Sequence, residues 1–482
     1  MTKPQHASFK FRHILPPLLA ALALSACGGS DSPPPEAARP QDSRTFTPVV
    51  SAFPAMTGLP DADRWSGVNK GASYQVEVPK NWNGMLVMYA HGYAGTGANL
   101  TVGPPAIRRY LLEQGYAWAA SSYSKNYYDV RAGVEDTNAL ALAFNDIAKQ
   151  NGRTLAAPSK TYIIGVSMGG HIAGAAVDEE NISTAINSVR YNGAVPMCGV
   201  LGDTELFDYF TAYQVAAQQE AGIPATSWPV TNWATIAPSV QSALFATFPT
   251  TATPTAAAVP TAKGQRLKQI VQGLTGGARP LFDVGYAGPL QSTVWGTFGS
   301  DGTITGILND RVVSTTNTVF QLDSNPALSA EETAYNASIF RVSATPDANR
   351  LRTDGLRWVP KTNARISVPV VTIHTLGDLY VPFSMEQIYK RRADALGTSG
   401  LLVQRAIRGV SHCDFTIAEQ TAAFSAMVNW EQKGVKPAGD DVLTPATVAD
   451  PKYGCKFTDN NFTQDDGATV RSVRTNIVPA CS

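Results

Sequence analysis

Hydrophobic residues fall into short runs that alternate with segments of helical periodicity, from Tyr74 to about residue 200. Short runs rich in β-branched residues are typical of buried strands, and apolar residues spaced three or four apart are typical of helices. The pattern predicts strands over residues 74–78, 85–90, 116–122, 161–166 and 189–197, and helices over 106–114, 135–150 and 171–178. This alternation favours an α/β fold with a mostly parallel sheet and flanking crossover helices.

The alternation stops after Gly199 and resumes at Ile366. A structureless loop of that length is rare in a compact domain, so we expect residues 200–365 to form a large inserted cap or lid. Beyond it the pattern predicts strands over 366–374 and 401–407, helices over 383–396 and 416–430, and a polar tail after Gly434. The expected core is therefore residues 49–199 and 366–435, followed by a C-terminal tail, 436–482, stapled by a disulfide.

The N-terminus has the features of a targeting signal. Three basic residues, Lys3, Lys10 and Arg12, come first. An apolar run over 14–23 follows, which is too short to span a bilayer. The run ends in Leu24-Ser25-Ala26-Cys27, which resembles the lipobox of bacterial lipoproteins. That resemblance implies a signal peptide over 1–26 and a lipid on Cys27; the alternative is an ordinary secretory signal that is cleaved nearby.

Residues 27–48 are rich in Gly, Ser and Pro, which suits a flexible tether. The sequence thus predicts an exported protein that is lipid-anchored to the bacterial cell envelope, at the periplasmic face or the cell surface. Lys and Arg total 38 and Asp and Glu total 38, so the net charge is +0. Without a basic excess, nucleic acid is not an expected partner.

Four cysteines remain after Cys27, an even number in a compartment that permits disulfides. They are Cys198, Cys413, Cys455 and Cys481. Three pairings are open, and we favour Cys455 with Cys481 because both lie in the C-terminal tail, which leaves Cys198 for Cys413.

The central motif is Gly165-Val166-Ser167-Met168-Gly169. A predicted β-branched strand precedes it and a helix of small residues follows, as a nucleophile elbow requires. The simpler interpretation is a glycine-rich turn with an inert serine. Strand, GxSxG elbow and helix, with an acid and a histidine later in the chain, resemble the α/β-hydrolase fold over about residues 70–435 apart from the insertion. The resemblance implies a serine nucleophile and is specific to the fold rather than to a substrate.

The acid is expected after a late core strand, where Asp378 follows Gly377. A carboxylate there would orient the catalytic histidine and stabilise its charged form. Asp414 and Asp323 are the alternative acids, and a simple helix-capping role is the alternative for Asp378.

Four histidines lie outside the signal region: His91, His171, His374 and His412. His412 follows the last predicted strand, in a loop that reaches the nucleophile in this family, and is the expected general base. The other three end an early strand, lie on the helix after the serine, or lie inside a strand.

The tetrahedral intermediate also needs hydrogen-bond donors for its oxyanion. The family places one backbone N–H after the strand 85–90 and the other after the serine, which implies Tyr93 and Met168. The strings Gly-Tyr-x-Gly-Thr and Ser-Met-Gly-Gly are similar to those of bacterial cutinases, which lack a large insertion. Turn geometry is the simpler interpretation of the glycines.

Cys413 adjoins His412, so a bridge to Cys198 would pin the histidine loop. Some tannase-like and feruloyl esterase-like enzymes tie their histidine to the elbow by a disulfide, but there the partner cysteine adjoins the serine. Here the neighbours of Ser167 are Val166 and Met168.

The chain has no zinc-spaced Cys/His cluster, phosphate loop or dinucleotide fingerprint, so neither a metal nor a cofactor is expected. The sequence predicts a serine hydrolase that cleaves a small or oligomeric carboxylic ester through an acyl-enzyme. An amidase or peptidase with the same triad is one alternative. A non-catalytic surface-binding lipoprotein on the same scaffold is the other.

Overall fold

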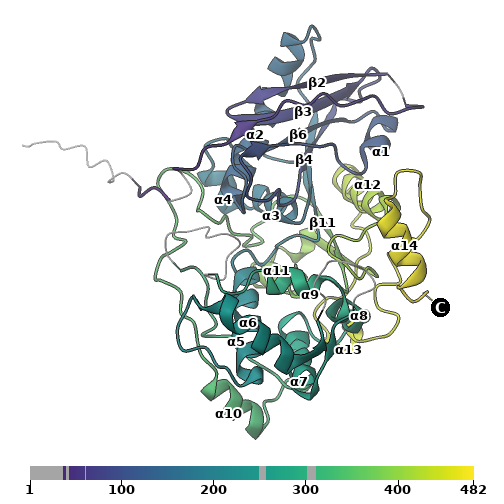
Figure 1. Ribbon diagram of the computed structural model, residues 1–482. Coiled ribbons are helices and arrows are strands. Elements are labelled where there is room, and N and C mark those ends of the chain that lie inside the picture. The colour runs from purple at the N-terminus through teal and green to yellow at the C-terminus, as the bar shows by residue number, and fades with distance from the viewer. Residues whose placement is uncertain (1–35, 40–42, 60, 249–256, 301–310, 482) are drawn as a thin grey trace, which may run out of the picture. The chain divides into compact units, whose positions relative to one another are not determined.

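An eight-stranded sheet lies at the centre of the computed structural model (Figure 1). Its order is β12-β11-β8-β7-β4-β6-β3-β2. The strands are β2 (Ala62–Asn69), β3 (Ala72–Pro79), β4 (Met85–Ala90), β6 (Ala117–Ser121), β7 (Lys160–Val166), β8 (Gly193–Met197), β11 (Val370–Thr375) and β12 (Leu402–Ile407). Only β2 with β3 and β3 with β6 pair antiparallel. The predicted class is confirmed, since this is an α/β-hydrolase fold with a mostly parallel sheet.

The structure describes residues 36–39, 43–59, 61–248, 257–300 and 311–481. Ala38–Ser482 form one compact unit, apart from the unit Met1–Ala37. The predicted signal peptide, Cys27 and most of the predicted tether lie outside the described residues. Among the residues that are described, no helix is both long and apolar enough to span a bilayer.

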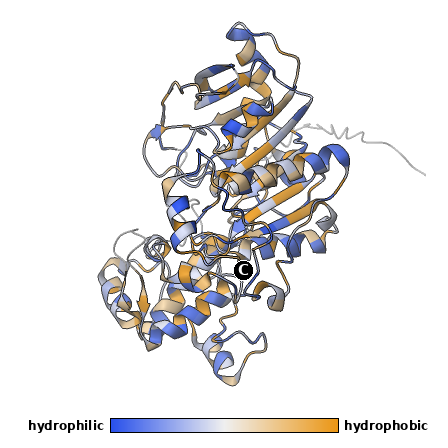
Figure 2. Ribbon diagram, turned by 90° about the vertical axis from the view of Figure 1, so that its right-hand side faces the viewer, coloured by the Kyte–Doolittle hydropathy of each residue, from blue (hydrophilic) through white to orange (hydrophobic). Residues whose placement is uncertain are grey.

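Helices cover both faces of the sheet, so its middle strands are hydrophobic on both sides (Figure 2). On one face lie α2 (Val130–Gln150), α3 (Met168–Ala176) and α11 (Ser384–Ala395). On the other lie α1 (Arg108–Glu113) and α12 (Ile417–Lys433). Every residue of β6, β11 and β12 is buried, as expected for central or helix-covered strands.

The boundaries of several predicted elements shift for local reasons. The second predicted helix begins at Val130 rather than at 135, because the Asp129 side chain accepts a hydrogen bond from the Ala132 amide and caps it. Strand β11 begins at Val370 rather than at 366, directly after Pro369. Strand β2 was not predicted, because its partly buried residues alternate weakly.

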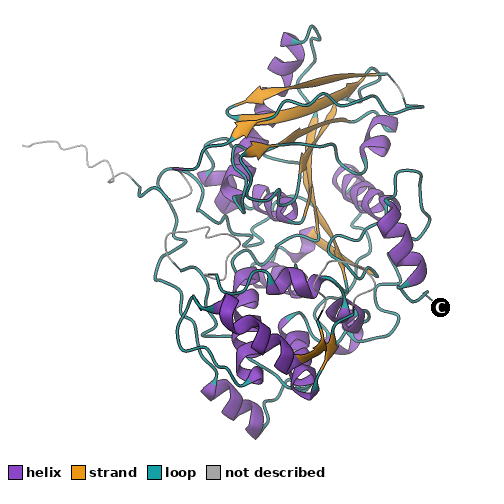
Figure 3. Ribbon diagram, in the orientation of Figure 1, coloured by secondary structure: helices purple, strands orange, loops and turns teal. Residues whose placement is uncertain are grey.

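The regular elements described in the insertion are mostly helices, joined by long loops (Figure 3). Helix α4 (Glu179–Thr184) precedes β8 and lies outside the insertion. The described elements of the insertion are α5 (Glu205–Ala221), α6 (Trp233–Leu244), β9 (Phe245–Thr247), β10 (Val259–Pro260), α7 (Ala262–Leu274), α8 (Phe282–Ala287), α9 (Leu290–Trp295) and α10 (Ala330–Ser338). Aromatic rings pack between these elements. The ring centroid of Trp295 lies 5.8 Å from those of Trp233 and Phe245 and 5.1 Å from that of Phe298. These rings belong to the same hydrophobic cluster as the residues that cover one face of the sheet, so the insertion and the core share a continuous interior.

The predicted polar tail after Gly434 also contains regular structure that the sequence pattern did not indicate. The tail contains α13 (Pro445–Val448) and α14 (Ala468–Asn476), and buries Val442 and Tyr453 against the core. Arg474 of α14 is buried in an ion pair with Glu419 of α12, at 2.9 Å. Packing between segments far apart in sequence, rather than local periodicity, orders this region.

Candidate active site

Ser167 occupies a sharp turn between β7 and α3. Its φ of 58° and ψ of −122° are strained for a residue with a side chain. A Cβ on Gly165 would lie 2.0 Å from the Gly169 carbonyl oxygen, and one on Gly169 would lie 2.0 Å from the Ala90 carbonyl oxygen. Both glycines are thus required by close backbone contact, and the turn holds the serine hydroxyl at the carboxyl edge of the sheet.

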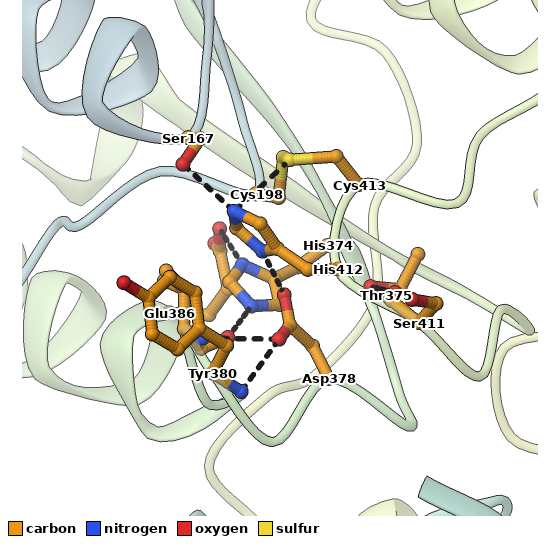
Figure 4. Close-up of a disulfide and its surroundings, with 11 residues drawn as sticks. Ser167, Cys198, His374, Thr375, Asp378, Tyr380, Glu386, Ser411, His412 and Cys413 are labelled. Atoms are coloured by element: carbon orange, nitrogen blue, oxygen red, sulfur yellow. Dashed lines mark hydrogen bonds and ion pairs between the residues drawn. A yellow bond between two sulfur atoms is a disulfide. The ribbon is translucent and has the colours of Figure 1, made fainter. Parts of the chain in front are cut away.

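The three predicted catalytic side chains form one hydrogen-bonded series (Figure 4). His412 Nε2 lies 2.7 Å from Ser167 Oγ, and His412 Nδ1 lies 2.6 Å from Asp378 Oδ2. They come from the loops that follow β7, β11 and β12. Because parallel strands end at the same edge of a sheet, these loops bring residues 245 positions apart together.

The Asp378 side chain is fully buried, whereas 17% of the His412 side chain is exposed. Asp378 Oδ1 accepts hydrogen bonds from the backbone amides of Tyr380 at 2.9 Å and Val381 at 3.0 Å. This leaves Oδ2 directed at the imidazole. The carboxylate is therefore held by its own loop and faces only one side-chain donor, His412, in the described part of the chain.

Helix α5 of the insertion contacts the loop that carries the acid. The Tyr209 hydroxyl donates to the Leu379 carbonyl at 2.8 Å, and Phe210 stacks on Tyr380 with ring centroids 5.5 Å apart. Tyr380 in turn packs edge-on against His412, at 5.6 Å between centroids. The insertion thus supplies one wall beside the histidine.

Both favoured disulfide pairs are present: Cys198 with Cys413, and Cys455 with Cys481. Cys198 follows β8, and Cys413 Sγ lies 3.4 Å from His412 Nε2. The two sulfurs and His412 are the single group of three possible metal ligands found in the described residues. As disulfide sulfurs they are not thiolate ligands, so this group does not constitute a metal site.

Two backbone segments flank the serine where an oxyanion would form. Met168 is the first residue of α3, where backbone N–H groups have no partner within the helix. Gly92 lies against the serine, since a Cβ there would be 3.3 Å from Ser167 Cβ and 3.8 Å from Oγ. Tyr93 follows Gly92 directly. The sequence analysis did not single out Gly92, although a glycine just after a strand end is the signal for such close approach.

The remaining histidines and acids bond elsewhere. His171 is fully buried between the Tyr128 hydroxyl at 2.9 Å and the Pro360 carbonyl at 2.7 Å, and burial lowers its pKa. His91 stacks on Tyr123, and its pKa is also lowered by burial. The two alternative acids accept bonds from nearby amides: Asp414 from Val410 and Asp323 from Asn325.

No protein-family profile matches the chain. An o-phthalyl amidase from Xanthobacter agilis is 28% identical over 92 residues, which is 19% of this chain and 20% of that protein. The match thus spans about a fifth of the relative's length.

Two solved structures show a distant likeness. Feruloyl esterase B from Aspergillus oryzae has a TM-score of 0.41 and 15% identity, covering 81% of this chain and 87% of that one. Acylaminoacyl peptidase from Pyrococcus horikoshii has a TM-score of 0.36 and 9% identity, covering 80% and 44%. Such likeness concerns the general fold alone and carries no information on substrate.

Proposed function

We propose that the protein is a serine hydrolase that cleaves small or oligomeric carboxylic esters through an acyl-enzyme. The observation that carries the proposal is the hydrogen-bonded series from Asp378 through His412 to Ser167, with distances of 2.6 and 2.7 Å. In this arrangement Ser167 Oγ attacks the ester carbonyl carbon while His412 Nε2 accepts the hydroxyl proton. Asp378 holds the Nδ1–H and stabilises the imidazolium that forms.

The later steps of the reaction use the same groups. The carbonyl oxygen becomes an oxyanion, and the backbone amides of Tyr93 and Met168 are the proposed donors to it. As the ester C–O bond breaks, His412 returns the proton to the departing alcohol. Water then attacks the acyl-enzyme, giving one proton to His412, and the carboxylic acid leaves as Ser167 regains its hydrogen.

An amidase or peptidase activity is the second candidate. It is favoured by the 28% identity to an o-phthalyl amidase over 92 residues. Both reactions pass through the same kind of tetrahedral intermediate, so the same side chains serve either one. An ester and an anilide that share one acyl group separate the two, because only an amidase turns over the anilide at a rate comparable to the ester.

We further propose that the mature protein is anchored to the cell envelope by a lipid on Cys27. The lipobox-like Leu24-Ser25-Ala26-Cys27 supports this, and two disulfides fit an oxidising compartment. Incorporation of labelled palmitate into the full chain, but not into Cys27→Ser, is the expected result. Equal labelling of both would contradict the anchor.

The nucleophile is tested by treating the full chain with a fluorophosphonate probe and mapping the adduct by mass spectrometry. We expect the adduct on Ser167 and none in Ser167→Ala, whose kcat on esters should fall by about six orders of magnitude. A folded protein that takes no adduct and hydrolyses no ester would support the non-catalytic binding scaffold instead.

A further inference from the structure

A second histidine is hydrogen-bonded to the loop that carries Asp378. His374, in β11, is fully buried, and its Nε2 lies 2.8 Å from the Val381 carbonyl oxygen. A carbonyl oxygen only accepts, so Nε2 must carry the hydrogen of this bond. The position of the ring is therefore tied to the backbone of the loop that contains Asp378.

The other nitrogen of this ring faces a buried carboxylate. His374 Nδ1 lies 3.4 Å from Glu386 Oε1, and among the described residues neither atom has another hydrogen-bond partner. Glu386 Oε2 accepts from Thr372 Oγ1 and Gln404 Nε2, each at 2.5 Å. A proton on Nδ1 satisfies both remaining atoms at once. Burial alone would lower the pKa of His374, but the Glu386 carboxylate together with Asp378 and the Val381 carbonyl outweighs burial, so that the pKa is raised.

Val381 links this pair to the acid. Its N–H donates to Asp378 Oδ1 at 3.0 Å, and its carbonyl accepts from His374 at 2.8 Å. Movement of Val381 would redirect one of the two amides that set the direction of the Asp378 carboxylate.

We propose that His374 and Glu386 form a buried positioning pair that holds the 378–381 loop so that Asp378 faces His412. The inference rests on the proposed function and adds to it two residues outside the catalytic series. In the described part of the chain no hydrogen bond joins either residue to Ser167 or His412; both act through Val381. The protonated ring also offsets the Glu386 charge, which would otherwise be a second uncompensated anion buried near Asp378.

Two neutral variants separate the hydrogen bond from the bulk of the side chain. In His374→Gln the side-chain amide nitrogen can occupy the position of Nε2 and donate to the Val381 carbonyl. In His374→Asn the shorter side chain places its nitrogen only at the position of Nδ1, so the bond to Val381 is lost. We expect kcat on an ester to stay within about five-fold of wild type in His374→Gln and to fall about 10- to 100-fold in His374→Asn. KM should change less than two-fold in both. Equal losses of kcat in the two variants would overturn the proposal.

A double-mutant cycle tests whether the pair acts through the acid. In an Asp378→Asn background, His374→Asn should lower kcat by less than about three-fold further. His171→Asn is the matched control, because His171 is also fully buried and also bonds a loop carbonyl through Nε2. His171→Asn should change kcat by the same factor in the wild-type and Asp378→Asn backgrounds. If His374→Asn does the same, the positioning role is wrong.

A milder variant covers the case in which His374→Asn does not fold. Thr372→Val keeps the side-chain shape but removes one of the two donors to Glu386 Oε2. We expect kcat to fall at least about three-fold with KM unchanged, because the carboxylate can then turn away from His374. An unchanged kcat in a folded Thr372→Val protein would overturn the proposal.

A failure of the hydrolase proposal can be distinguished from a failure of the positioning role of His374 and Glu386. If the wild type neither hydrolyses esters nor labels at Ser167, that proposal fails, and the pair is then tested by proton NMR. A short charge-assisted hydrogen bond between His412 and Asp378 gives a far-downfield imidazole proton. We expect this signal in the wild type and in His374→Gln, and its loss in His374→Asn. Its persistence in His374→Asn would overturn the positioning role by itself.

Discussion

Cys198 and Cys413 are 215 residues apart in sequence, yet a disulfide joins them with their Cα atoms 5.4 Å apart. The bridge ties the end of β8 to the residue that follows His412. It therefore connects the sheet directly to the loop on which the proposed general base is carried.

Removing this bridge should affect both stability and catalysis. In the chain-entropy description, a cross-link that closes so long a loop contributes about 5 kcal/mol. We expect the double variant Cys198→Ser, Cys413→Ser to lose several degrees in Tm and at least about ten-fold in kcat, because the histidine loop gains freedom. Thermal unfolding and ester hydrolysis measure the two effects.

The Cys455–Cys481 bridge supplies the matched control, since it closes a sequence separation of 26 in the tail. Its double serine variant should lose about 3 kcal/mol of stability while kcat at low temperature stays within two-fold. Equal loss of kcat in both double variants would mean that the first bridge acts only through global stability.

The elbow glycines should tolerate no side chain. Gly169→Ala would place a Cβ 2.0 Å from the Ala90 carbonyl, so the helix must move away from β4. We expect a loss of at least about 3 kcal/mol in the free energy of unfolding and loss of labelling at Ser167. Denaturant unfolding and the fluorophosphonate probe measure these.

Gly97→Ala is the control for that substitution, because an added Cβ there meets no atom within 4 Å. It should change stability by less than about 0.5 kcal/mol. A well-folded, fully labelled Gly169→Ala protein would show that the elbow adapts more than the close contact suggests.

How far the sequence predicted the structure depended on the range of the interactions. The GxSxG turn and the strands around it follow from local glycine and β-branched patterns, so β4 was predicted to the residue at Met85–Ala90. The grouping of Ser167, Asp378 and His412 could be expected because parallel strands end at the same edge of a sheet, and each residue follows a predicted strand. Their distances still came only from the structure.

Features made by packing between distant segments were missed. Glu386 lies twelve residues beyond His374 and pairs with it only because α11 packs on β11, where Gln404 of β12 also reaches the carboxylate. The helices of the tail were not predicted for the same reason, since its few apolar residues become a core only together with Leu376, Phe383 and Ala406. Neither arrangement leaves a periodic signal in the sequence.

The His374–Glu386 pair gives stability a defined pH dependence. Burial opposes the charge on His374, but Glu386 and, farther away, Asp378 raise its folded-state pKa above the ordinary value. The native state therefore holds this proton more tightly than the unfolded chain does. The contribution is fully present below about pH 6.5 and is lost as pH rises through the raised pKa.

Glu386→Gln should remove this dependence. A neutral ring can keep its bond to Val381 and accept at Nδ1 from the amide that replaces the carboxylate, so the fold is retained. The advantage of the wild type over Glu386→Gln in free energy of unfolding should shrink as pH rises from about 6.5 through the raised pKa of His374. A constant difference across that range would indicate that His374 stays neutral throughout.

Asp208 of helix α5 gives an independent test with a carboxyl group. Burial raises its pKa to about 8, although the Ser314 amide donates to it at 2.7 Å. A raised carboxyl pKa means that the native state binds more protons than the unfolded chain between about pH 4 and pH 8. Stability should therefore fall as pH rises through that window and stay low above it.

Asp208→Asn keeps an oxygen to accept from Ser314 and removes the charge. At pH 9 it should be more stable than the wild type by about 1–3 kcal/mol, less than the full shift implies, because the helix N-terminus favours a negative charge. At pH 4 the difference should vanish, since the wild-type group is then protonated in the native state. Asp61→Asn, at an exposed position, should change stability by less than about 0.5 kcal/mol at either pH. If Asp208→Asn were instead less stable at pH 9, the ionised carboxylate would be the form that joins helix α5 to the segment around Ser314.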